Sequence, residues 1–154
     1  MTDQPYNNDA LLIQQDVTIN RVVALLREAG LPCRPDDDEI NIIGPNTPFW
    51  MRIRPEQLLI EFFIEVELRN LRSRGNETAN RLNDMSHVQW LFFKASHQRP
   101  PFLVARVCMS YEGGVVAAQM IRYAREFPSM VYTLVKAIGA DIISLVPKTN
   151  ALIH

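Results

Sequence analysis

The stretch LNDMSHVQWLFFKASHQRPPFLVARVCMSYEGG, residues 82–114, decides the fold of this chain. It begins as the end of a helix and continues as two apolar strands, 87–95 and 102–111, joined by a proline-containing turn. Gly113 and Gly114 then break the second strand and lead into a long helix. We therefore expect the rest of the chain to supply strands that pair with this hairpin and helices that cover it.

Upstream of the hairpin, the sequence predicts two helices and three strands. The first helix, 18–29, has apolar residues at helical spacing and ends at Gly30 and Pro32. The strands alternate between an apolar face and a mixed face, which is typical of an antiparallel sheet covered on one side. We expect these strands at 39–43, 49–54 and 58–66, followed by a charged connection at 67–75 and a helix at 76–85.

The last helix is expected to run from about residue 115 to residue 138. Its apolar spacing keeps its phase across Pro128, which predicts a kinked helix, or two helices in line, rather than a reversal. Strand 87–95 is apolar on both sides, so it should lie centrally in the sheet or at a subunit contact. The fold class is α+β: a five-stranded antiparallel sheet with helices packed on one face, in the order α-β-β-β-α-β-β-α. We divide the chain into a flexible tail (1–15), one domain (16–140) and a C-terminal extension (141–154).

Composition excludes several classes of protein. The net charge of −1 supplies no global field for nucleic acid. No apolar run approaches the roughly 18 residues of a membrane span, and the polar N-terminus lacks the basic start of a signal peptide. We expect a cytoplasmic protein with no membrane or nucleic-acid partner. Nucleic-acid binding ranks last among the functions considered. It would have to use four arginines: Arg69, Arg72, Arg74 and Arg81.

No catalytic set or metal cage is visible in the sequence. The histidines and the two cysteines, Cys33 and Cys108, are too scattered for a zinc site. The triple aspartate 36–38 lacks the alternating ligands of a calcium loop and is expected to be a solvated turn. We expect no enzyme activity, no metal and no cofactor.

Glu61 and Glu65 lie on the same face of a predicted strand, about 7 Å apart. That separation would suit acid–base chemistry. Arg52 and Arg54 share this face on the neighbouring strand, so cross-strand ion pairing is the favoured interpretation.

The mixed face of the predicted sheet is the candidate binding surface. Aromatic anchors among arginines are typical of protein–protein contacts. The alternative is that a further helix or the C-terminal tail covers this face. The residues we expect to bind protein are Trp50, Arg52, Leu59, Phe63 and Arg106.

Two segments, NETANRLNDMSHVQWLFFKAS (76–96) and FLVARVCMSYEGGVV (102–116), together with the helix that follows, carry a family resemblance. Over about residues 18–139 the chain resembles the YbjN-like family, described as proposed bacterial sensory transduction regulators, with a fold similar to class I type III secretion chaperones. The resemblance implies a homodimer, regulatory or chaperone-like binding of another polypeptide, and no cofactor or catalytic residue. The alternative function is a small-molecule sensor with a pocket between sheet and helices.

Overall fold

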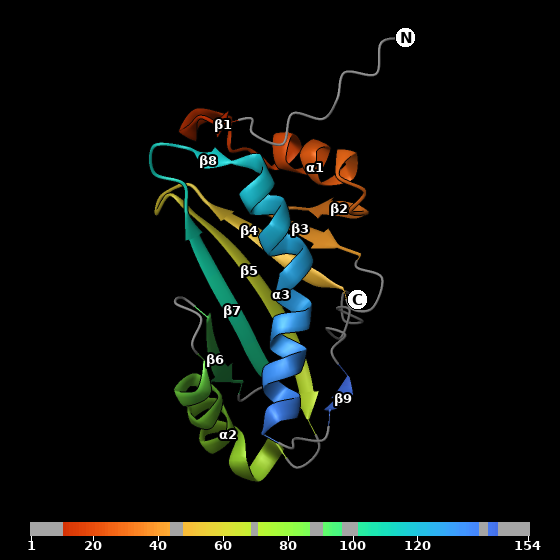
Figure 1. Cartoon of the computed structure of the whole chain (residues 1–154), viewed down its shortest axis with the longest axis vertical. Helices are drawn as coiled ribbons and strands as arrows, with labels where there is room; N and C mark the ends of the chain where they lie inside the picture. Colours follow the sequence, from red (N-terminus) through yellow and green to blue (C-terminus); the bar gives the residue numbers. More distant parts are fainter. Residues whose placement is uncertain are drawn as a thin grey trace.

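A computed structural model describes residues 11–43, 48–68, 71–86, 91–96, 102–138 and 142–144 (Figure 1). A twisted antiparallel sheet forms one layer, and helix α3 lies along one of its faces. The elements are β1 (Leu11–Leu12), a 3-10 turn (Gln14–Asp16), α1 (Ile19–Glu28), β2 (Cys33–Asp36), β3 (Glu39–Ile42), β4 (Phe49–Arg54), β5 (Leu59–Leu68), α2 (Leu71–Met85), β6 (Leu91–Ala95), β7 (Leu103–Ser110), β8 (Val115–Val116), α3 (Ala117–Ala137) and β9 (Ile142–Ser144).

The main sheet has the strand order β2-β3-β4-β5-β7-β6, and all its pairings are antiparallel. This confirms the α+β class with an antiparallel sheet, but the sheet has six strands along this path rather than five. The additional strand is β2, whose second half was expected to be an acidic turn. Pro35 is tolerated because β2 is an edge strand. The turn itself is only Asp37 and Asp38, with Asp37 at a positive φ of 51°.

Helix α1 has the ends that its sequence predicts. The Thr18 side chain accepts a hydrogen bond from the Arg21 amide at the N-terminus. Gly30, with φ of 74°, ends the helix. The Leu31 amide then donates to the Leu26 carbonyl at 2.9 Å, closing a Schellman motif between two buried leucines.

Helix α2 begins at Leu71, five residues before the expected start at residue 76. Residues 71–75 of the expected connection are therefore helical, and Gly75 lies inside the helix at a cost of about 1 kcal/mol. Tertiary packing offsets this cost, because Ala79 and Leu82 are buried in the core beside the sheet.

Strand β6 lies at the edge of the described sheet, so the central position considered for it is wrong. Strand β6 has apolar residues on both faces because one face packs on the core and the other presents Phe92. Leu91 and Phe93 face the core, whereas Phe92 is 44% exposed on the opposite face. The first residues of the expected strand, 87–90, lie outside the described part of the chain.

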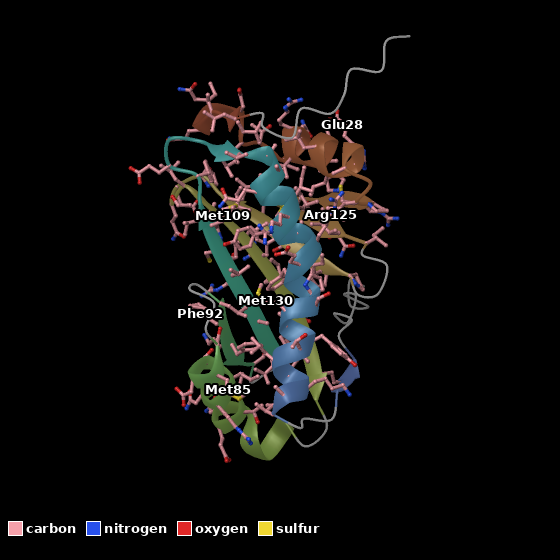
Figure 2. The ribbon with its side chains drawn as sticks, viewed as in Figure 1. Glu28, Met85, Phe92, Met109, Arg125 and Met130 are labelled. Carbon is pink, nitrogen blue, oxygen red and sulfur yellow. The ribbon has the colours of Figure 1, made fainter. Side chains whose placement is uncertain are left out.

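Helix α3 runs through Pro128 without reversing, as predicted (Figure 1). Arg125 of α3 donates a 2.6 Å hydrogen bond to the Ala29 carbonyl, which ties α3 to the C-terminal end of α1 near the labelled Glu28 (Figure 2). No helix in the described ranges is both long enough and apolar enough to cross a membrane.

The N-terminal segment docks against the glycine turn that precedes α3. Within the expected tail, β1 pairs with β8, and the Gly113 amide donates to the Gln14 side chain at 3.4 Å. Gly114 has φ of 114°, and a Cβ there would lie only 2.7 Å from the Leu12 carbonyl oxygen. Glycine is therefore required by this close approach. In the expected C-terminal extension, β9 pairs with the end of β5.

The core lies between the sheet and the helices. Phe62 of β5 packs against Tyr123 and Phe127 of α3, each with a ring-centroid distance of 6.3 Å, and Phe49 of β4 meets Phe127 edge-on at 5.7 Å. α1, α2 and α3 all contribute buried apolar side chains to this single cluster. Their packing therefore fills the inner face of the sheet and leaves the opposite face without a helix in the described structure.

Candidate functional site

The outer face is the side of the sheet opposite α3, and its most continuous feature is a row of paired residues. Trp50 of β4 lies opposite Phe63 of β5, which lies opposite Arg106 of β7, which lies opposite Phe92 of β6. Directly paired residues share a face of the sheet, so these four side chains form one row across four strands.

Ring contacts join Trp50 to Phe63 and Arg106 to Phe92 within this row. Trp50 and Phe63 stack with centroids 5.7 Å apart and planes inclined by 14°. The Arg106 guanidinium lies over the Phe92 ring at 5.1 Å, and the Arg52 guanidinium lies over the Phe63 ring at 5.0 Å. Each arginine is therefore held against an aromatic surface, which pre-orders it for a partner.

Four of the five residues expected to bind protein come together in this row and beside it: Trp50, Arg52, Phe63 and Arg106. Leu59 does not join them. It is paired with Arg54 and Ser110 at the start of β5, four residues before Phe63. Leu59 is thus at the end of the outer face and not at its centre.

A buried carboxylate lies beneath the arginines. Glu61 is the one charged residue among those described that is buried. Its Oε1 accepts a 2.8 Å hydrogen bond from Nη1 of Arg106, and its Oε2 lies 3.4 Å from Nε of Arg54 and 3.6 Å from Nη1 of Arg52. Arg52 also pairs with Glu39. The expected cross-strand ion pairing of Glu61 is confirmed, although its carboxylate is buried rather than solvated.

The cluster is held by charge more than by hydrogen-bond geometry. Nε of Arg52 and Oε2 of Glu61 are buried and have no hydrogen-bond partner. Three arginines share one carboxylate, so their geometry is a compromise in which only the Arg106 contact is short. One buried carboxylate therefore fixes the positions of three arginine side chains on the outer face.

Two neighbouring groups have raised pKa values. Burial raises the pKa of the Cys108 thiol, the nearby charge of Glu61 raises it further, and Arg106 and Arg54 oppose the shift. Cys108 therefore stays a thiol at neutral pH and is a poor nucleophile. Burial also raises the pKa of Glu65.

No three His, Cys, Asp or Glu side chains of the described residues come together in a way that could hold a metal ion. The triple aspartate forms the end of β2 and its turn. The three histidines, which the sequence spacing had argued against as zinc ligands, lie outside the described ranges: His87, His97 and His154.

Side chains cover backbone groups at both edges of the sheet. On β6, the Asn83 amide of α2 binds both polar groups of the Phe93 backbone: Phe93 N–H donates to Oδ1 at 2.6 Å, and Nδ2 donates to the Phe93 carbonyl at 3.0 Å. On β2, Arg27 donates through Nε and Nη2 to the Cys33 carbonyl at 3.3 and 3.1 Å, and Pro35 has no N–H to offer. These devices blunt the edges against strand addition, so the outer face is the better contact surface.

Sequence reasoning missed two members of the site, Phe92 and Glu39. The pattern placed Phe92 on a strand face but gave no pairing that would put it under Arg106. Glu39 was expected to begin a strand, but its ion pair with Arg52 depends on the register between β3 and β4. A register signal across the turns would have been needed to find either residue.

The fold and the outer face define a class of protein: an α+β domain in which helices cover one face of an antiparallel sheet and the other face presents aromatic and charged groups. A solved structure with the same fold is that of YbjN, a proposed transcription regulator from E. coli. It matches with a TM-score of 0.69 and 13% sequence identity over 86% of this chain and 99% of that chain. This likeness shows a shared fold. No family model matches the sequence, and no curated protein matches it.

Proposed function

We propose that this chain is a non-enzymatic regulatory or chaperone-like domain that binds another polypeptide through its outer face. The observation that carries the proposal is the row Trp50–Phe63–Arg106–Phe92 with Arg52 beside it. Aromatic and arginine side chains dominate the energetics of protein interfaces, and here they are ordered before any partner arrives.

The structural neighbour adds loose support for a regulatory kind of role, because YbjN is described as a proposed transcription regulator. We infer that the chain is a distant relative of the YbjN-like family, that it works in the cytoplasm, and that it forms a homodimer. A second copy would be one candidate for the outer face.

The competing function is a small-molecule sensor that uses a pocket between sheet and helices. The aromatic packing of Phe62 against Tyr123 and Phe127 occupies that interface in the described structure, which favours protein binding. Thermal-shift screening against metabolites tests the alternative, since a ligand of the folded state raises the melting temperature.

The test of the proposal is capture of partners by a tagged protein from its native host, with mass spectrometry to identify them and light scattering to measure oligomeric state. The double variant Trp50→Ser, Phe63→Ser should lose a stoichiometric partner while remaining folded. The matched control is Tyr132→Ser, which removes an exposed aromatic residue from α3. Equal capture by both variants would show that the outer face is not the binding surface.

A further inference from the structure

We propose that the partner segment of the outer face is acidic, with carboxylates that pair with Arg54 and Arg106 and apolar side chains that pack beside Trp50. This inference rests on the proposed function and adds the chemistry of the partner. The first observation concerns how deeply each charged group is buried in one cluster on this face. Its members are Arg52, Arg54, Arg106, Glu39 and Glu61.

In this cluster the carboxylates are more deeply buried than the guanidinium groups. The side chains of Glu61 and Glu39 are 7% and 22% exposed, whereas those of Arg52, Arg54 and Arg106 are 26%, 36% and 45% exposed. A partner that approaches the sheet therefore meets guanidinium groups before it meets the carboxylate. Because interaction energy falls with distance, the exposed groups set the charge that the partner meets.

The cluster also carries surplus positive charge. Its three arginines are opposed by two carboxylates, Glu61 and Glu39, which leaves one positive charge. The other charged positions on this face lie outside the cluster, and one of them, Glu67, is at the far end of β5 beside β9. The remaining four offset each other in pairs. Glu65 and Lys94 both pair with Val104, and Arg34 and Asp36 share strand β2. The surplus is thus centred on Arg54 and Arg106.

These two arginines keep guanidinium surface available. Arg106 contacts Glu61 through Nη1, and Arg54 contacts it through Nε, so both remain substantially exposed while anchored. A guanidinium has five N–H donors in a planar fork that matches a carboxylate, and such charge-assisted pairs are among the strongest hydrogen bonds in proteins. Anchoring by Glu61 lowers the entropy lost when an arginine binds a second carboxylate.

Geometry favours an acidic polypeptide over a nucleic acid. Binding of single strands relies on free aromatic faces for base stacking. The Phe63 ring is already in contact with Trp50 and with the Arg52 guanidinium, and one face of the Phe92 ring lies under Arg106. Carboxylates and apolar side chains need only the guanidinium edges and the periphery of the aromatic row.

The experiment measures binding of fluorescein-labelled peptides to the full chain by fluorescence anisotropy. The probes are a peptide of repeated Glu-Tyr-Gly-Ser units, the matched Lys-Tyr-Gly-Ser peptide, and a thymidine oligonucleotide of similar length. We expect the acidic peptide to bind at least about tenfold more tightly than the lysine peptide at low salt, and to weaken as ionic strength rises.

Variants locate the effect. Arg54→Gln with Arg106→Gln should weaken the acidic peptide about tenfold, whereas the matched control Arg122→Gln, on the exposed surface of α3, should not. Glu61→Gln removes the buried negative charge but keeps a side-chain oxygen that can accept from Arg106, so Arg106 stays anchored and the acidic peptide should bind more tightly if the variant remains folded. Trp50→Phe should abolish any change in tryptophan emission that the peptide produces.

Four results would overturn the inference. Equal binding of the acidic and lysine peptides, or no loss in the double arginine variant, would remove the charge preference and leave the proposed protein contact standing. Tighter binding of the oligonucleotide than of the acidic peptide would assign the arginines to nucleic acid. Failure of every probe to bind, together with capture of a partner that depends on Trp50 and Phe63, would show a partner of different chemistry.

Discussion

Phe62 and Phe63 are neighbours in β5, yet they belong to two different regions of the molecule. Phe62 is fully buried on the inner face, where it packs against Tyr123 and Phe127 of α3. Phe63 is half-buried on the outer face, where it stacks on Trp50 and lies under the Arg52 guanidinium. Alternation along the strand separates them, so one strand supplies both the stability of the fold and the order of the contact surface.

The largest effect is expected from a matched pair of substitutions at these two residues. Phe62→Ala should lower the free energy of unfolding by about 3–5 kcal/mol, because it removes a buried ring and leaves a cavity. Phe63→Ala should cost only about 1 kcal/mol of stability, mostly the lost stacking with Trp50, but should weaken partner binding. Chemical denaturation and partner capture measure the two outcomes. Similar losses of stability in both variants would contradict the division between the faces.

The second prediction concerns the charge centre of the outer face. Glu61→Gln should destabilise the protein by about 1–3 kcal/mol, because hydrogen bonds to charged groups have this range and three arginines lose their shared partner. The matched control is Glu126→Gln, which breaks an exposed pair with Arg122 on α3 and should cost less than about 0.5 kcal/mol. Urea unfolding of both variants distinguishes them. An effect of Glu61→Gln as small as that of the control would show that the cluster adds no stability.

The alternation of apolar and mixed residues was enough to predict β4, β5 and the two faces of the sheet, because a period of two is a local property. The ends of α1 were predictable for the same reason, since Thr18 and Gly30 act on backbone within a few residues. Four of the five expected contact residues lie together because they share a face on strands that are adjacent or nearly adjacent in sequence order.

Long-range pairing was not predictable. The contact between Arg106 and Phe92 depends on the register of β6 with β7, and nothing in the local pattern fixes that register. Strand β2 was missed because Pro35 and the aspartates disfavour a strand by propensity, whereas an edge position tolerates them. The early start of α2 has a similar cause: packing of Ala79 and Leu82 against the sheet overrides the local weakness at Gly75.

The third prediction tests whether partners are directed to the face of the sheet and away from its edge. Asn83→Ala should cost about 1–2 kcal/mol, because the Phe93 N–H and carbonyl both lose their partner. It should also open β6 to pairing with another copy, which light scattering would detect as concentration-dependent association.

Asn80→Ala, at an exposed position of α2, is the matched control and should do neither. Asn83→Asp should have an intermediate effect, since a carboxylate can still accept from the Phe93 N–H but cannot donate to its carbonyl. Association that is unchanged in Asn83→Ala would show that α2 does not guard this edge.

The smallest effect is expected at Glu65, a partly buried carboxyl on the outer face. Burial raises the pKa of this carboxyl above 4.5. The folded state therefore binds its proton more readily than the unfolded state, and folding loses stability as pH rises through the folded pKa. Glu65→Gln stays neutral at every pH, so it should be more stable than the wild type at neutral pH by at most about 0.5 kcal/mol.

The gain from Glu65→Gln should shrink as pH falls and vanish well below the ordinary pKa of a glutamate, where the carboxyl is protonated in both states of the wild-type chain. Thermal unfolding at a series of pH values measures it. A gain that is constant across this range would indicate a packing effect in place of desolvation. If Glu65→Gln is instead less stable than the wild type at neutral pH, the ionised Glu65 has a stabilising cationic partner. The positive and negative charges of the outer face would then be more evenly paired than the arginine cluster alone implies.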